Sequence, residues 1–193
     1  MTVAQSHTLE SKRCVLRHVT EEDIPHVFSA TKHTGFNDGM VWDPPVEAIE
    51  LLQPFRDSCD AWASGLAYVF TIETHEKVFI GRISIRATDS DSLWNLGFWT
   101  HPKHQGQGYM TEAVESVLKF GFEELSATEI EACHASWNEA SKKVLLRCGM
   151  NWREHIPKGF KKHGKWVAEE RLSKIKPTLA EQGVPAKSDR AGG

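Results

Sequence analysis

Hydrophobic and polar residues alternate with different periods along the chain, and each change of period predicts a new element. Residues 14–19, CVLRHV, alternate as a short strand does. A Thr and an Asp three residues apart then give the start signal of a helix over 20–30. Helical spacing returns over 46–64. Between these helices, residues 33–45 are rich in Gly, Asn, Asp and Pro, which predicts an irregular, exposed loop.

Three segments rich in β-branched and aromatic residues follow the second helix. They are LAYVFTIE (66–73), KVFIGRISIRA (77–87) and SLWNLGFWT (92–100). The segments THEK and TDSD between them are short and polar, as the turns of β-hairpins are. The three strands are therefore expected to run antiparallel to one another.

The second half of the chain alternates between helices and strands. A long amphipathic helix is predicted over 109–125, because its apolar residues recur three and four positions apart. A strand over 128–136 and a helix over 138–148 come next, and Gly149 is placed to end that helix. Two further segments with strand character lie at 150–156 and 165–173.

The composition supports one compact domain. The chain has 193 residues, of which 40% are hydrophobic and 25% charged, as in ordinary globular proteins. We expect a single domain over 1–175, whereas the polar residues 176–193, rich in Gly, Pro and Ala, predict a disordered tail. The net charge of −3 gives no general attraction to phosphate backbones, which argues against nucleic acid as a partner.

The absence of export and membrane-spanning signals in the sequence, together with its cysteine pattern, predicts a cytoplasmic protein. The sequence lacks the apolar core of an export signal and any apolar run of membrane-spanning length, so we expect no membrane partner. Its cysteines, Cys14, Cys59, Cys133 and Cys148, are scattered without a CxxC spacing, which favours reduced thiols. The oligomeric state, monomer or homodimer, stays open.

The stretch HQGQGYMTEA, residues 104–113, places Gly106 and Gly108 immediately before the predicted long helix. A helix N-terminus exposes unpaired amide groups, and glycines there let a phosphate approach the backbone. The alternative is that these glycines only turn a strand into a helix. A P-loop requires a Lys and then Ser or Thr after its second glycine, and a dinucleotide fingerprint requires a small residue where Thr111 stands. The sequence fits neither pattern.

Two longer strings, LGFWTHPKHQGQGYMTEAVESVLKFGF and IEACHASWNEASKKVLLRCGM, resemble the GNAT superfamily of acyl-CoA N-acyltransferases, most closely its RimJ/RimL-like branch. The resemblance runs from about Cys14 to Ser173. It implies an α/β fold of the α+β type, in which helices flank a central, mostly antiparallel sheet. The strands at 94–100 and 130–135 are expected to splay apart and to hold acetyl-CoA, as co-substrate, between them.

The resemblance also implies which residues hold acetyl-CoA. The family's phosphate motif, Q/R-x-x-G-x-G/A, maps onto residues 105–110, although Met110 stands where a small residue is usual. Backbone amides at the end of the preceding strand are expected to hold the pantetheine arm. The cofactor-binding residues expected on this basis are Phe98, Trp99, Thr100, Gln105, Gly106, Gln107, Gly108, Tyr109, Met110, Thr111, Asn138 and Ser141.

Acetyl transfer needs a neutral amine, donors for the developing oxyanion and a proton for the thiolate, and an α-amine, with a pKa of about 7.7–8.0, is partly neutral without a strong base. Asn138 and Ser141 open a predicted helix, where they either cap it or face the cofactor. The family likeness favours Asn138 as a cofactor contact and Ser141 as a partner of the thiol. Candidate catalytic bases are His134 and Glu154, because Asn95 occupies a place where some relatives carry a carboxylate. The alternative for His134 is a structural histidine satisfied by local hydrogen bonds.

The loop over 33–45 is the candidate acceptor site. Asp38, Trp42 and Asp43 predict an acidic, aromatic rim for a cationic amine, and the alternative is a merely solvated loop. The histidines and cysteines follow no HExxH or paired CxxC spacing, so no metal is expected.

Together these observations predict an N-acetyltransferase that moves an acetyl group from acetyl-CoA to a primary amine by direct attack in a ternary complex. The acceptor is either a protein N-terminus or a small-molecule amine. The alternative is a non-catalytic acyl-CoA-binding sensor or partner-binding module, because the helix over 138–148 lacks the Tyr that many relatives use as a general acid. A nicotinamide enzyme is a third reading, distinguished by binding of NAD(H).

Overall fold

The computed structural model describes residues 3–90 and 92–177 of the chain. Its strands are β1 (Leu9–Glu10), β2 (Cys14–His18), β3 (Ala67–Thr74), β4 (Phe79–Ala87), β5 (Leu93–Thr100), β6 (Glu129–Ala135), β7 (Asn151–Lys162) and β8 (Lys165–Ile175). Its helices are α1 (Ile24–Thr31), α2 (Leu52–Ala63), α3 (Tyr109–Glu123) and α4 (Glu139–Arg147). Short 3₁₀ helices are η1 (Glu21–Asp23), η2 (Ala48–Leu51) and η3 (Pro102–His104).

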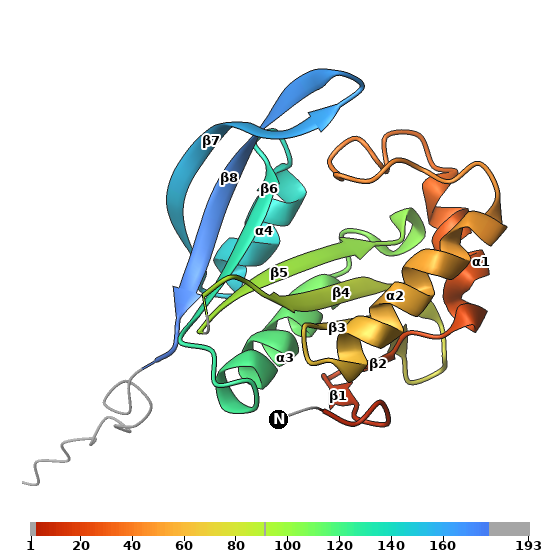
Figure 1. Cartoon of the computed structure of the whole chain (residues 1–193), viewed down its shortest axis with the longest axis horizontal. Helices are drawn as coiled ribbons and strands as arrows, with labels where there is room; N and C mark the ends of the chain where they lie inside the picture. Colours follow the sequence, from red (N-terminus) through yellow and green to blue (C-terminus); the bar gives the residue numbers. More distant parts are fainter. Residues whose placement is uncertain (1–2, 91, 178–193) are drawn as a thin grey trace, which may run out of the picture.

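The strands form one eight-stranded sheet in the order β1-β2-β3-β4-β5-β6-β8-β7 (Figure 1). Neighbours in the sheet are antiparallel except β5 and β6, which pair in parallel. Figure 1 shows α1 and α2 side by side, and the β7–β8 hairpin at the other end of the sheet. This mixed, mostly antiparallel sheet flanked by helices confirms the expected fold class.

Most predicted elements are present with small shifts at their ends. The meander of β3, β4 and β5 pairs antiparallel as expected. Both N-terminal helices begin with a 3₁₀ turn, β7 continues beyond the predicted end at residue 156, and the short β1 was not predicted. The predicted disordered tail lies, from residue 178 onward, outside the described residues. Among the helices described, none combines the length and apolarity that crossing a membrane requires.

The hydrophobic core lies on both faces of the sheet because side chains of a strand alternate between faces. Tyr68, Phe70 and Ile72 of β3 belong to the larger cluster, which also contains the apolar stripe of α3. Val69 belongs to a second cluster, formed with residues of α1 and α2 such as Phe55. The β3 strand is therefore buried along its whole length.

Gly121 allows α3 to lie close to the sheet. A Cβ at this position would lie 2.6 Å from the Cδ1 atom of Ile130 and 2.8 Å from the Cδ1 atom of Ile85. Those distances are shorter than van der Waals contact, so a larger residue would push the helix away from β4 and β6. The glycine in the middle of the helix is thus explained by close packing.

The sheet opens between β5 and β6. Leu93–Asn95 pair with Glu129–Glu131, and the pairing of these two strands ends there. Beyond that point β5 stays paired with β4 as far as Thr100, and β6 stays paired with β8 as far as Ala135. Each strand follows its outer partner, so a gap widens between them, as the family resemblance implied.

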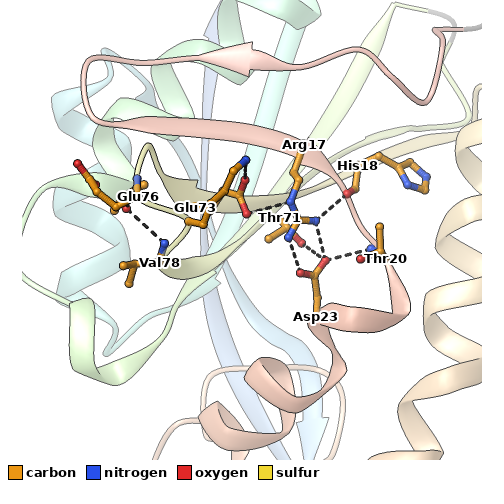
Figure 2. A network of polar contacts seen from close by, with 10 residues as sticks. Arg17, His18, Thr20, Asp23, Thr71, Glu73, Glu76 and Val78 are labelled. Carbon is orange, nitrogen blue, oxygen red and sulfur yellow. Dashed lines mark hydrogen bonds and ion pairs between the residues drawn. The ribbon is translucent and has the colours of Figure 1, made fainter.

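A buried ionic network joins β2, β3 and the start of α1 (Figure 2). The Arg17 guanidinium lies 2.7 Å from Oδ1 of Asp23 and 3.0 Å from Oε2 of Glu73. Oδ2 of Asp23 also accepts hydrogen bonds from the Thr71 hydroxyl at 2.7 Å and the Thr20 amide at 3.0 Å. Every oxygen of this buried carboxylate is therefore satisfied, and the network fixes where α1 begins.

Asp23→Asn should lower the free energy of unfolding at pH 7 by about 2 kcal/mol, because it removes the charge-assisted hydrogen bonds between Asp23 and Arg17 and leaves Glu73 as the remaining partner of that guanidinium. Burial alone raises the pKa of the Asp23 carboxyl, but the hydrogen bonds from Arg17, Thr20 and Thr71 outweigh it and hold that pKa below its usual value. Urea unfolding at several pH values measures the effect.

The stability contributed by a carboxylate with a depressed pKa is complete above its unfolded-state pKa of about 3.9 and is lost as pH falls through the folded-state pKa. The Asp23→Asn protein should therefore lose less stability below about pH 4 than the unmodified protein does. Glu21→Gln is the control, since that carboxylate is exposed and pairs with exposed Arg56. Equal effects of the two substitutions would contradict the role of the network.

Candidate active site

A cleft of about 600 Å³ lies where β5 and β6 separate. Its walls come from the second half of β5, the segment that enters α3, the end of β6, one side of α4 and the loop between α1 and η2. Five segments that are distant in sequence thus meet around one cavity, and most of the predicted site residues lie in them.

The segment that enters α3 has an unusual backbone. Gly106 has φ +74° and Gly108 has φ +84°, values that residues with a Cβ rarely adopt. The first helical hydrogen bonds are donated by the amides of Thr111 and Glu112 to the Gly108 carbonyl, at 3.1 and 3.4 Å. The amides before Thr111 precede this ladder, so a helix N-terminus with small residues opens onto the cleft.

Six of the seven residues predicted around this turn line the cleft. Those six are Gln105, Gly106, Gly108, Tyr109, Met110 and Thr111. Gln107 lies outside the lining, and its side chain donates to the Lys103 carbonyl at 3.3 Å. Met110 is 5% exposed and packs in the main core, so the large residue at this family position extends into the apolar stripe of α3.

The cleft side of β5 presents unpaired backbone. Phe98, Trp99 and Thr100 line the cleft, together with Leu96 and Gly97. One edge of this segment pairs with β4, while the edge toward β6 has no strand partner beyond Asn95 within residues 3–90 and 92–177. Backbone amides and carbonyls on that edge are therefore available to a ligand, as predicted for the pantetheine arm.

Asn138 and Ser141 lie at the start of α4, and both line the cleft. Asn138 is the N-cap residue, and its Oδ1 accepts the Ser141 amide hydrogen at 3.1 Å. Capping thus occupies this side-chain oxygen. Neither residue is excluded from contact with a ligand, because both are only half buried.

His134, near the end of β6, has a hydrogen-bond partner for one of its two ring nitrogens. Its Nδ1 lies 2.8 Å from the Ala135 carbonyl oxygen, and since a carbonyl only accepts, Nδ1 carries the hydrogen. In the neutral ring Nε2 then has a free lone pair. Nε2 is buried and has no hydrogen-bond partner among the described residues, although His134 lines the cleft. A local hydrogen bond was expected, but the unpaired nitrogen was not.

Glu154 does not share this cavity. It lies on β7, outside the cleft lining, and its carboxylate is 2.8 Å from Nη1 of Arg171. The ion pair occupies the carboxylate on another part of the sheet. Of the two bases predicted from sequence, the structure therefore brings only His134 to the cleft.

The loop between α1 and η2 forms one wall of the cleft and contacts three other segments of the chain. Phe36 packs edge-on against Trp99, with ring centroids 5.2 Å apart. A Cβ on Gly39 would lie 3.3 Å from the ring of Trp137. Nζ of Lys162, near the tip of the β7–β8 hairpin, donates to the Trp42 carbonyl and to Asp43, both at 2.8 Å. Figure 1 shows this hairpin reaching toward the loop.

The residues predicted to form an acidic, aromatic rim do not line the cleft. Asp38 is exposed, and Asp38, Trp42 and Asp43 all lie outside the cleft lining. The hydrogen bond from Lys162 lowers the pKa of Asp43, whose charge is already paired. Phe36 and Met40 of the same loop line the cleft instead.

Several lining residues were missed from sequence. They are His104 before the glycine turn, Cys133 on β6, Trp137 before α4, and Lys143 and Arg147 on α4. Helical spacing contained part of this signal, because residues 140, 141, 144 and 147 recur at three- and four-residue intervals and share one side of a helix. Cys133 and Trp137 had no such local signal. The side chains of Lys143 and Arg147 add positive charge to the lining of the cleft.

Comparisons with known proteins agree with this geometry. The family profile described as "Acetyltransferase (GNAT) domain" matches residues 13–151. YoaA of Bacillus subtilis (strain 168), named an uncharacterized N-acetyltransferase, is 26% identical over 149 residues, which are 73% of this chain and 81% of YoaA. The structure of RimL, a ribosomal alpha-N-protein acetyltransferase in complex with coenzyme A, superposes with a TM-score of 0.80 at 16% identity, covering 88% of this chain and 98% of RimL.

A spermidine N-acetyltransferase from Vibrio cholerae, in complex with coenzyme A and spermine, superposes with a TM-score of 0.74 at 17% identity and covers 84% of this chain and 95% of its own. These structural likenesses support the fold, and the family match extends over more than half of the chain. The predicted family, enzyme class and co-substrate are thereby confirmed. The chain belongs to the GNAT acetyltransferase family and is an acetyl-CoA-dependent N-acetyltransferase.

Proposed function

We propose that this enzyme transfers the acetyl group of acetyl-CoA to a primary amine by direct attack in a ternary complex. The observation that carries the proposal is the single cleft that joins the glycine turn before α3 to His134 and Ser141. A donor and an acceptor that bind together in one continuous cavity can react directly with each other.

The residues of the cleft fit coenzyme A at its diphosphate end. The left-handed glycines remove side chains from the turn, and the α3 N-terminus offers amide donors and a positive dipole end to an anion. Lys143 and Arg147 line the same cavity and provide cationic groups. We assign the diphosphate to residues 105–111 and the pantetheine arm to the unpaired edge of β5.

When bound, acetyl-CoA supplies an activated carbonyl and a thiolate leaving group. Where the acetyl group would lie, backbone amides of β5 are available as hydrogen-bond donors to the thioester carbonyl oxygen. The free Nε2 of His134 accepts the proton that the amine loses on attack. The hydroxyl of Ser141 donates a hydrogen bond to the departing sulfur. Asn138 holds the first turn of α4, and with it Ser141, in place.

A covalent acetyl-enzyme is the alternative route, and Cys133 is the thiol in the cleft lining. Burial raises the pKa of the Cys133 thiol, although a hydrogen bond with Arg171 opposes the shift. A thiol with a raised pKa is largely protonated at neutral pH and is a weak nucleophile. This favours direct attack by the amine over transfer through Cys133.

The acceptor is a protein N-terminus or a small-molecule amine. An α-amine has a pKa of about 7.7–8.0 and is partly neutral at cellular pH, so one weak base such as an imidazole suffices for it. RimL and the spermidine acetyltransferase are named for acceptors of both kinds. The loop side of the cleft here is formed by Phe36, Met40 and Trp137 rather than by carboxylates. That lining favours an acceptor whose amine is attached to an apolar group.

Release of free thiol from acetyl-CoA should occur with at least one amine in a panel of N-terminal peptides, amino-acid amides, aromatic amines and spermidine. Initial-velocity plots with both substrates varied should give intersecting lines, as a ternary complex requires. Parallel lines would indicate a covalent intermediate and contradict direct attack. Tight coenzyme A binding without turnover on any amine would instead support the non-catalytic alternative.

Gly106→Val should weaken coenzyme A binding by about tenfold or more, because a β-branched side chain strains a left-handed turn and extends into the diphosphate site. Isothermal titration calorimetry measures the dissociation constant. Gly164→Val in the β7–β8 turn is the matched control, since Gly164 has φ +77° and, like Gly106, open space around its Cβ position. Unchanged affinity in a folded Gly106→Val protein would refute the placement of the diphosphate.

His134→Gln should lower kcat by about 100-fold, the contribution typical of a general base, while the dissociation constant of coenzyme A stays within about twofold. Steady-state kinetics with the best amine of the panel measures the first quantity and calorimetry the second. His155→Gln is the control, because that histidine is exposed on β7 and bonded to Glu170. If both variants retain the unmodified kcat, His134 is not the base.

A further inference from the structure

We propose that Arg13 is a positioning residue for acetyl-CoA: it holds the diphosphate-binding turn in shape from behind and neutralises a carboxylate beside it. The proposal rests on the proposed function, in which the turn at 105–111 binds the diphosphate. Arg13 itself lies outside the cleft lining, immediately before β2. Its effect on the ligand is therefore exerted through the turn.

The Arg13 side chain contacts the turn and the first residues of α3 at three places. Its Nη2 donates to the Gln107 carbonyl at 3.0 Å, and its Nε donates to Oε1 of Glu112 at 2.6 Å. Its guanidinium lies over the ring of Tyr109, 4.4 Å from the ring centroid. One planar group thus joins the peptide before Gly108 to the first turn of the helix.

The hydrogen bond to Gln107 sets the direction of the next amide. In a trans peptide the carbonyl of one residue and the amide of the following residue point in opposite directions. With the Gln107 carbonyl directed to Arg13, the Gly108 amide is directed away from Arg13. Gly108 lines the cleft and Gln107 does not, which agrees with an amide directed to the ligand side.

Space behind the turn is also limited by Arg13. A Cβ on Gly108 would lie 3.3 Å from Nη2 of Arg13, and the φ of +84° already disfavours a side chain there. The guanidinium therefore packs directly against the glycine backbone. Two separate features therefore favour glycine at position 108. One is its left-handed backbone conformation, and the other is the close approach of the Arg13 guanidinium.

Glu112 explains the need for a positive charge at this place. It lies in the first turn of α3, where its carboxylate alone would repel a diphosphate. It accepts hydrogen bonds from the Arg13 side chain, from the Arg13 amide at 3.1 Å and from the Ser11 hydroxyl at 3.0 Å. Burial raises the pKa of Glu112, but the bonds from Arg13 and Ser11 outweigh burial and lower it. The carboxylate is thus charged and anchors Arg13, which neutralises it.

The test compares Arg13→Gln, Arg13→Lys and the unmodified protein by calorimetric titration with coenzyme A. Arg13→Gln should weaken binding by about tenfold, since it removes both the bond to Gln107 and the charge beside Glu112. The coenzyme A affinity of Arg13→Lys should lie between those of Arg13→Gln and the unmodified protein, because an ammonium keeps the charge but lacks the planar two-bond geometry. Arg56→Gln, which removes the same charge from a distant exposed pair, should leave the affinity unchanged.

A second measurement separates positioning from general damage to the fold. S-acetylpantetheine donates the same acetyl group but lacks the diphosphate, so its kcat/KM should be unchanged in Arg13→Gln while kcat/KM for acetyl-CoA falls. An equal loss with both donors would overturn the proposal, as would coenzyme A affinity within about twofold of the unmodified value. If Arg13→Gln does not fold, the same criteria apply to Arg13→Lys.

Comparing Gly106→Val with Arg13→Gln tests the role of Arg13 separately from the placement of the diphosphate. Weakened binding in Gly106→Val with unchanged binding in Arg13→Gln would overturn only the role of Arg13. Unchanged binding in both would overturn the placement of the diphosphate as well.

Discussion

The active site depends on one constraint, which is that β5 and β6 pair over only three residues each before they separate. A continuous parallel pair would have used the backbone groups of both strands for the sheet itself. Because β5 follows β4 and β6 follows β8, each inner edge has no strand partner in the described part of the chain where the cleft begins. In the proposed complex acetyl-CoA would take the place of the missing pairing, so that binding surface and sheet architecture would have the same origin.

Residues at and just before β2 contact segments that lead into the cleft. Arg17 joins β2 to the start of α1, and α1 leads directly into the loop that forms one wall of the cleft. Arg13, four residues earlier, contacts the turn that enters α3. Two arginines of one short segment thus hold two segments that lead into the cleft, the start of α1 and the turn before α3.

Sequence reasoning succeeded where the signal was local. The stripe of α3, the hairpins of β3 to β5 and the glycine turn are all encoded within a few neighbouring residues, and the family resemblance correctly gave the fold, the enzyme class and the co-substrate. It failed for pairings between distant segments. Neither the ion pair of Lys162 with Asp43 nor the contact of Arg13 with Gln107 has a signature in either segment alone. The roles of individual residues in binding and catalysis stay predictions.

The attachment of the loop at Trp99, Trp137 and Lys162 has a thermodynamic consequence. A loop that is already ordered by aromatic packing and a buried ammonium has little conformational entropy left to lose when a substrate arrives. Its ordering is completed during folding of the chain. If the acceptor binds against this loop, as proposed, acceptor choice depends on complementarity to a preformed wall, and an amine too bulky for that wall must first break contacts that stabilise the folded protein.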